Sequence, residues 1–226
     1  MSIDPGALYR LTAWLSPAYP VGAFSYSHGL EYAVEAGLVP DRRALVDWID
    51  FALERGAGAI DGPLVVQAMR AADDPAALDR LADLAAALKG TAELALESRQ
   101  QGEAFLAITR RAWPSKALDS FAERRAGRPI AHAVAFGLAA ATQADSRIAA
   151  FLYLQAFAAN LVSAGVRLIP LGQTDAQMAV AELLPAVERA ADAAVATPFE
   201  DIGAAALGID WCSMRHETQY TRLFRS

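Results

Sequence analysis

The chain has 226 residues, of which 54% are hydrophobic and 20% are charged, and its formal net charge at pH 7 is −6. This composition suits one folded domain with a substantial buried core and excludes long disorder, because enough apolar surface is available to offset the entropy lost on folding. The acidic balance and the absence of a long Lys/Arg cluster exclude a nucleic-acid binder, and a single cysteine excludes an internal disulfide framework.

One stretch, residues 148–166, carries no formal charge and reaches the length of a membrane-spanning helix. Much of it is alanine, which contributes little to insertion, and Gln155, Asn160 and Ser163 interrupt it. We therefore expect a buried helix of a soluble bundle and no membrane partner. Because no basic flank precedes an apolar run at the start of the chain, we also expect no signal peptide and a cytoplasmic location.

Apolar residues recur at helical spacing through almost the whole chain, and no run of alternating β-branched residues indicates a strand. The first helix must end before Pro17, because the residue that precedes a proline is disfavoured in helical geometry. Residues 16–24, which are rich in proline and glycine, are predicted to form a loop. A helix over residues 27–36 should then end at Gly37, a residue type suited to the left-handed turn after a helix, and Asp41 should cap the next helix.

Further start and stop signals divide the rest of the chain. In order, they are Gly62 with Pro63, Asp74 with Pro75, Gly90, Thr91, Pro114, Pro129, Asp145, Pro170 and Pro185. We expect the two Gly/Asp–Pro pairs to begin helices and Pro185 to kink one. The fold class predicted is all-α, a single-domain bundle over residues 1–226 with about nine or ten helices. Residues 208–226 have a weaker apolar pattern and are expected to form a loosely ordered, partner-binding C-terminal tail.

Catalytic residue patterns are scarce. Ser25, Ser27 and His28 lie close in sequence, but neighbours at a helix start point in different directions, whereas a catalytic triad needs convergent geometry. We expect these hydroxyls to cap the helix, and a helical enzyme that uses His28 with one of the serines is the weaker alternative. Because no Walker motif or dinucleotide fingerprint is present, we predict neither an enzyme nor a bound cofactor.

Metal ligands are equally few. The soft or intermediate candidates are His28, His132, His216 and Cys212. Cys212 and His216 are four positions apart and would share a helix face, so a weak metal contact there is an alternative. Two ligands without a third nearby make a poor site, and we predict no metal centre. His132 lies in an apolar stretch and is expected to be a hydrogen-bonded core histidine.

Three segments contain features beyond a helical pattern of apolar residues. The first, PVGAFSYSHGLEYAVEAG, is either a rigid turn that docks a helix or a partner surface; Phe24 and Tyr26 offer aromatic area, and Gly29 permits close approach of another backbone. The second, NLVSAGVRLIPLGQTD, places Arg167 in the last turn of a buried helix, where a cation complements the helix dipole. The third is the tail, which combines charges with apolar anchors in Arg215, His216, Glu217, Tyr220, Arg222, Leu223, Phe224 and Arg225. Such anchors suit a segment that orders against a partner.

In their order and their distances from the two ends, these three segments resemble the UreF family of urease accessory proteins. SPAYPVGAFSYSHGLEYAVEAG, residues 16–37, resembles the opening of that family, and SMRHETQYTRLFRS, residues 213–226, resembles its ending. LVSAGVRLIPLGQTD supports both. Between about residues 41 and 160 the resemblance to the family is limited to a helical pattern of apolar residues.

The resemblance implies an all-helical, homodimeric and non-enzymatic adaptor that joins UreD (also called UreH) and the GTPase UreG on the urease apoprotein for GTP-dependent nickel insertion. Few His or Cys residues are present, so nickel is expected to pass through the complex without a strong site on this chain. The resemblance further implies UreD contacts at Arg215, Tyr220, Arg222, Leu223, Phe224 and Arg225, with Tyr26 and its loop as a structural or partner surface. As an alternative, Arg167 is expected to regulate the GTPase in trans, much as an arginine finger does.

Overall fold

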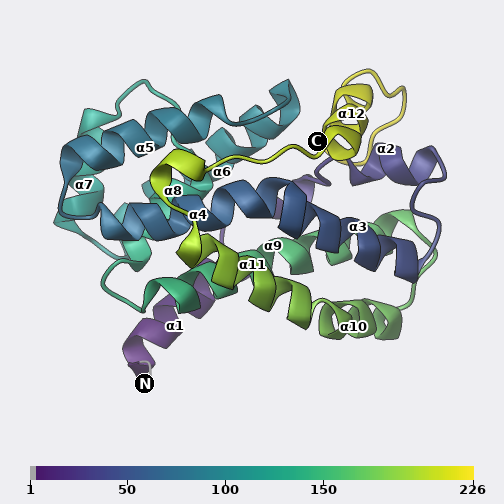
Figure 1. Cartoon of the computed structure of the whole chain (residues 1–226), viewed down its shortest axis with the longest axis horizontal. Coiled ribbons are helices and arrows are strands. Elements are labelled where there is room, and N and C mark those ends of the chain that lie inside the picture. The colour runs from purple at the N-terminus through teal and green to yellow at the C-terminus, as the bar shows by residue number, and fades with distance from the viewer. Residues whose placement is uncertain (1–3) are drawn as a thin grey trace.

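The computed structural model describes residues 4–226, so residues 1–3 of the predicted domain lie outside the described residues. Within 4–226 the chain forms twelve α-helices and two short 3₁₀ helices, and no strand (Figure 1). In chain order these are α1 (Pro5–Trp14), η1 (Ala23–Ser25), α2 (Leu30–Glu35), α3 (Arg42–Arg55), α4 (Ala57–Arg70), α5 (Pro75–Ala87), α6 (Ala92–Ala112), α7 (Lys116–Arg124), α8 (His132–Ala140), α9 (Ser146–Leu168), α10 (Gln173–Glu182), α11 (Leu184–Ala196), η2 (Phe199–Asp201) and α12 (Leu207–His216). The predicted all-α class is confirmed, whereas the predicted nine or ten helices are too few.

The turn between α3 and α4 shows why a local proline signal misplaced a helix start. Helix α4 begins at Ala57, so Pro63 lies inside it and not at its first position. Gly56 separates the two helices with φ −113° and ψ −134°. A Cβ on Gly58 would lie 2.6 Å from backbone atoms of Leu53, so the turn is tight enough to require a residue without a side chain. The contact between consecutive helices therefore sets this boundary, and the prediction of a start at Pro63 is wrong.

Other boundaries follow the local signals. The side chain of Asp41 accepts a hydrogen bond from the Ala44 amide at 2.9 Å and caps α3 as predicted. Gly37, which follows α2, has φ +74°, as expected for a residue that ends a helix. Pro185 lies in the first turn of α11, where its missing N–H leaves no bond unmade. The expected kinked single helix is therefore two helices, α10 and α11.

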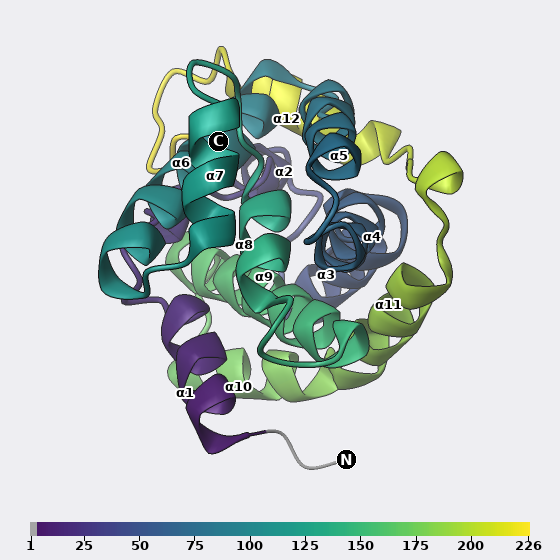
Figure 2. The ribbon, with the colours of Figure 1, turned by 90° about the vertical axis from the view of Figure 1, so that its left-hand side faces the viewer.

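The longest helix, α9, lies in the middle of the molecule beside α8, with α1, α5 and α11 toward the periphery (Figure 2). It packs against α4, α8, α10 and α11, and also against α2 and α3. By length and composition α9 is the single helix of the described residues that could cross a membrane, but half of its apolar window is buried by these neighbours. Such burial is usual for the core helix of a soluble protein.

Small residues let the central helices approach closely. Gly137 of α8 faces α4 at such short range that a Cβ there would lie 2.5 Å from the Val65 carbonyl oxygen. The contact between α4 and α8 is the most extensive between any two elements of the described chain. The abundance of alanine in the sequence therefore serves packing as well as helix propensity.

The C-terminal helix α12 packs on α2 and α6, on the side of the molecule opposite the amino terminus (Figure 1). Residues 217–226, which we call the tail segment, leave α12 and return over α2 to end beside the body of the protein. Phe224 and Ser226 are buried there, and several backbone and side-chain hydrogen bonds hold the segment. The segment that was predicted to be a loosely ordered tail is instead docked on the body of the protein in this structure, because its amides and its last side chain find hydrogen-bond partners there.

Candidate partner-binding site

The opening segment and the tail segment, which lie at opposite ends of the sequence, pair through their backbones. The Ser27 amide donates to the Ser226 carbonyl at 2.6 Å, and the Arg225 amide donates to the Ser25 carbonyl at 2.8 Å. The hydroxyl of Ser27 also donates to the Ser226 carbonyl. The two segments therefore form one site, and the start of α2 lies on the side of it that faces the protein interior.

The backbone at the start of α2 is shaped to receive α12. His28 has φ +60° and is the single non-glycine residue with positive φ in the described chain; Gly29 follows with φ +78°. A Cβ on Gly29 would lie 2.9 Å from the Ser213 nitrogen and 3.2 Å from the Ile209 carbonyl oxygen, both in α12. The prediction that Gly29 permits close approach of another backbone is confirmed. The strain at His28 is the cost of turning the chain into this contact.

A buried glutamate, Glu31 of α2, holds the tail segment by its main chain. One carboxylate oxygen accepts the Leu223 amide at 2.6 Å, and the other accepts the Phe224 amide at 2.9 Å. The second oxygen also lies 3.0 Å from Nε2 of His216, the last residue of α12. Three donors around one carboxylate stabilise its charge away from water.

His216 joins Glu31 to a second buried carboxylate, Glu93 of α6. Its Nδ1 lies 2.8 Å from Glu93, while Arg222 of the tail segment donates to the other oxygen of Glu93 at 3.0 Å. Both ring nitrogens of His216 therefore face carboxylate oxygens, and the ring joins α2 to α6. One histidine, one arginine and two carboxylates are thus held together in this part of the site.

A third buried carboxylate, Glu97, holds the end of the tail segment. It accepts hydrogen bonds from the Ser226 hydroxyl at 2.8 Å and from Gln101 at 3.1 Å, and it lies 3.3 Å from Nδ1 of His28. Burial alone would raise the pKa of Glu97, but the charge and hydrogen bond of His28, the Ser226 hydroxyl and the charge of Lys89 together hold it below its usual value. Glu97 is therefore an ionised anchor. We call Glu31, Glu93 and Glu97 the carboxylate cluster.

The residues of the enzymatic and metal alternatives make other contacts in this structure. The Ser27 hydroxyl faces the Ser226 carbonyl and accepts from the Glu31 amide at 3.3 Å, but α2 begins at Leu30 with Gly29 as its N-cap, and not at residue 27 as predicted. Both ring nitrogens of His216 face carboxylates. Among residues 4–226, no group of three or more His, Cys, Asp or Glu side chains has the arrangement of a metal site.

Arg167, at the end of α9, is where all three sequence segments meet. Its guanidinium carbon lies 4.2 Å from the centre of the Phe224 ring, which is a close cation–π contact. Its Nη2 donates to the Phe24 carbonyl at 2.8 Å. The Arg167 side chain is exposed at the surface, yet it links the opening loop, the C-terminal end of α9 and the tail segment.

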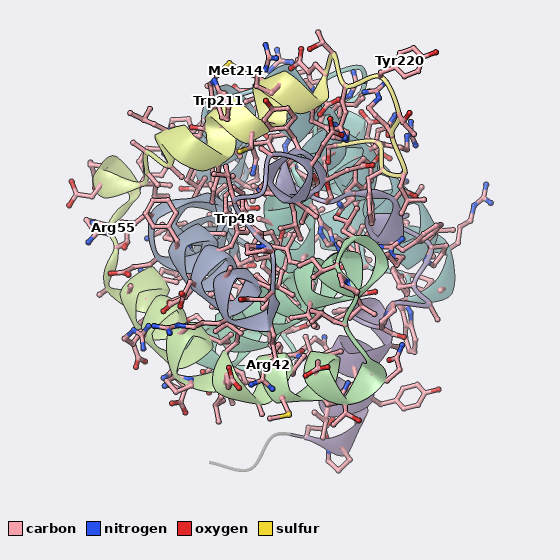
Figure 3. All side chains as sticks on the ribbon, turned by 90° about the vertical axis from the view of Figure 1, so that its right-hand side faces the viewer. Arg42, Trp48, Arg55, Trp211, Met214 and Tyr220 are labelled. Carbon is pink, nitrogen blue, oxygen red and sulfur yellow. The ribbon has the colours of Figure 1, made fainter. Side chains whose placement is uncertain are left out.

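The predicted contact residues divide into an exposed and a buried group. Exposed at the surface are Arg167, Arg215, Tyr220, Arg222, Leu223 and Arg225. Figure 3 shows Tyr220 projecting away from the body, beyond Trp211 and Met214 on α12. Tyr26 and Phe224 are buried, with only 2% and 3% of their surfaces accessible, so within this chain Phe224 anchors the tail segment in the interior and Tyr26 belongs to the core.

Sequence reasoning missed two kinds of residue. Glu31 and Glu93 have the appearance of ordinary helix surface charges in the sequence, and no local signal marks them as buried. Trp211 and Met214, in contrast, lie three positions apart on α12 and are about half exposed, at 47% and 50%. Their spacing puts them on one helix face, which was a usable signal.

A pocket of about 320 Å³ lies beneath the opening loop, between α1, α6, α8 and α9. Its walls are aromatic, and Glu97, Gln101 and His132 lie among its lining residues. Burial lowers the pKa of His132 to about 4, so the ring is neutral near pH 7. Its Nε2 has no hydrogen-bond partner, so the prediction of a core histidine holds for its place in the interior but is wrong for its hydrogen bonding.

Comparison with known proteins identifies the family. The UreF family model matches residues 39–184. The urease accessory protein UreF of Granulibacter bethesdensis is 56% identical over 228 residues, which cover all of this chain and 96% of that protein. The UreF of Rhodopseudomonas palustris strain HaA2 is 50% identical, covering all of this chain and 97% of its own length, and that of Bradyrhizobium diazoefficiens is 44% identical, covering 99% and 93%. This chain therefore belongs to the UreF family of urease accessory proteins.

Proposed function

We propose that this urease maturation factor is a non-enzymatic adaptor. In this proposal it holds UreD/UreH and the GTPase UreG together on the urease apoprotein for GTP-dependent nickel insertion, as a cytoplasmic homodimer. The family resemblance supports these partners. The observation that carries the adaptor role is the tail segment, which is fixed to the body through its main chain while Tyr220, Leu223, Arg222 and Arg225 are exposed.

The exposed side chains of the tail segment and α12 have the composition of a binding surface. Leu223 is 63% exposed although it lies on an anchored backbone, and Trp211 and Met214 expose further apolar area on α12. Aromatic residues and arginine are enriched among the residues that dominate binding energies. Because the backbone is already ordered, binding here costs less entropy than binding through a free tail. We infer that UreD docks on this surface.

Charge gives the same surface a preferred kind of partner. Arg215, Arg222 and Arg225 are exposed here, in a chain with a net charge of −6. A local basic surface on an acidic protein favours an acidic patch on its partner and speeds association at low salt. The association rate with UreD is therefore expected to fall as ionic strength rises.

Co-purification with UreD from the same organism tests the proposal. The intact chain should retain UreD, and deletion of residues 217–226 should abolish retention while the far-UV circular dichroism stays helical. The double substitution Tyr220→Ala with Leu223→Ala should weaken binding, whereas Leu184→Ala, an equally exposed leucine on α11, should not. A folded, intact chain that fails to bind UreD would refute the adaptor role.

A second candidate function is in-trans regulation of UreG by Arg167. The exposed position of this side chain favours it, but the guanidinium is already engaged with Phe224 and the Phe24 carbonyl and would have to leave both. Arg167→Ala separates the two roles. Lower GTP turnover in an assembled complex supports the regulator, whereas loss of UreD binding with normal turnover per assembled complex supports an anchor for the tail segment.

A further inference from the structure

We infer that Glu31 sets the register of the tail segment and so determines which of its side chains face a partner. The argument begins from the alternation of burial along the end of the chain. Leu223 and Arg225 are exposed, whereas Phe224 and Ser226 are buried. Residues 223 and 224 form a bend whose two consecutive amides turn toward Glu31, so a shift of the chain by one residue would bring different side chains to the exposed and the buried positions.

The carboxylate of Glu31 fixes that register at two adjacent amides. Its two oxygens bind the consecutive N–H groups of Leu223 and Phe224, one each, at 2.6 and 2.9 Å. The bidentate acceptor holds two adjacent amides, and the contact of Arg222 with Glu93 and the burial of Phe224 specify which two, because these side chains are not repeated at neighbouring positions. The Ser25 and Ser27 backbone contacts continue the same alignment toward Ser226.

The polar groups around Glu31 and the tail segment stabilise one another. Facing it are His216 from α12 and, through His216, Glu93 from α6, which in turn binds Arg222 of the tail segment. Removing the tail segment takes away two of the three donors to Glu31 and the arginine partner of Glu93. Buried carboxylates without such donors are costly, so the body of the protein favours the docked segment.

Another glutamate on the same helix provides a matched comparison. Glu35 lies one turn further along α2, is exposed, and contacts the tail segment only through the side chain of Gln219. It therefore holds no backbone amide. Glu31→Gln and Glu35→Gln remove the same charge from the same helix, but only the first disturbs the two amides.

Amide hydrogen exchange of the full-length protein measures the register directly. In Glu31→Gln, exchange at Leu223 and Phe224 should accelerate by roughly tenfold or more, since one amide loses its acceptor and faces an NH₂ group, while the other keeps only a neutral amide oxygen. Exchange in the core of α4 should change little, and Glu35→Gln should behave as the unsubstituted chain. Unchanged protection at Leu223 and Phe224 in Glu31→Gln would overturn the inference.

A second pair of variants leaves the helical body untouched. Leu223→Pro and Leu223→Ala both remove the exposed leucine, but only proline also removes the N–H that Glu31 accepts. The proline variant should lose protection at Phe224 and the alanine variant should keep it. Equal protection in the two variants would contradict the inference even if Glu31→Gln proved unstable.

The consequence for binding rests on the proposed function and is tested separately. Glu31→Gln should weaken UreD retention, while Glu35→Gln should not. If deletion of residues 217–226 left UreD binding intact, the proposed binding surface would be wrong. A different outcome is that the deletion abolishes binding while Glu31→Gln, with its amide protection lost, binds UreD normally. In that case the proposed binding surface would be supported, and the inference that Glu31 orients its side chains would be wrong.

Discussion

Replacing Gly29 by alanine tests whether the opening segment holds α12 through bare backbone contact. The new Cβ would lie 2.9 Å from the Ser213 nitrogen, and neither backbone can rotate aside. An alanine in the left-handed region costs about 1–2 kcal/mol, of which the stiffer unfolded chain returns about 0.4–1 kcal/mol. Overpacking against α12 adds about 1–3 kcal/mol. We therefore expect Gly29→Ala to lower the free energy of unfolding by about 2–4 kcal/mol.

Gly22→Ala is the matched control for this prediction. Gly22 has φ +76°, close to the +78° of Gly29, but a Cβ there would meet no atom within 4 Å. Its substitution should cost only the backbone term, about 0.5–1.5 kcal/mol. Urea titration followed by far-UV circular dichroism measures both costs. The fluorescence of Trp211, whose ring centre lies 5.4 Å from that of Tyr32 on α2, reports any displacement of α12.

The two outcomes distinguish a steric contact between Gly29 and α12 from backbone strain at the glycine itself. A larger cost for Gly29→Ala, with a changed Trp211 emission in the native state, supports direct backbone packing of α12 on the opening segment. Equal costs for the two variants, with unchanged emission, would refute it and leave only the left-handed geometry as the reason for glycine at both positions.

Three further predictions concern single side chains. The pKa of His132 is lowered to about 4, so the folded protein is fully stable with respect to this group above pH 6.5 and loses stability as the pH falls toward 4. The wild-type chain should therefore be less stable at pH 5 than at pH 7, and His132→Phe should remove about 2 kcal/mol of that difference. Urea titration at both pH values measures it. An unchanged pH dependence would contradict the assigned neutrality. Arg167→Ala should cost about 1 kcal/mol through the lost stacking on Phe224, and Arg167→Lys should restore only part of it; thermal melts that show full rescue by lysine would count against the stacking. Asp74→Ala should cost about 1 kcal/mol because its side chain caps two amides of α5, whereas Ser115→Ala, at a cap position without such a bond, should cost almost nothing in the same assay.

The elements that could be predicted from the sequence are those with local causes. Asp41 and Thr91 each bind an amide three residues ahead, and Gly37 ends a helix through its own backbone freedom, so a short window of sequence contains the whole reason. Pro63 had the same local signal, but the α3–α4 turn depends on Gly58 packing against Leu53. Tertiary contact overrode the proline there.

The site could be predicted only in part, for the same reason. The three segments were recognised, and Gly29 was correctly assigned a close backbone contact. The docked tail was not anticipated, because its receptors Glu31 and Glu93 lie far from it in the sequence, among residues that would suit a solvated helix face. Nothing within a helical turn of either glutamate indicates that backbone amides or a histidine ring from the other end of the chain will contact it.

The mutual compensation around His216 also limits how this family can diverge. Glu31, Glu93 and His216 are all buried, and the two ring nitrogens of His216 face the two carboxylates. Removing one partner from such a buried set costs about 3–5 kcal/mol, whereas replacing the whole set by apolar residues of similar volume is often neutral. A chain with one member exchanged is therefore expected to be less stable than a chain with all three present or all three replaced. We expect the three positions to change together among relatives.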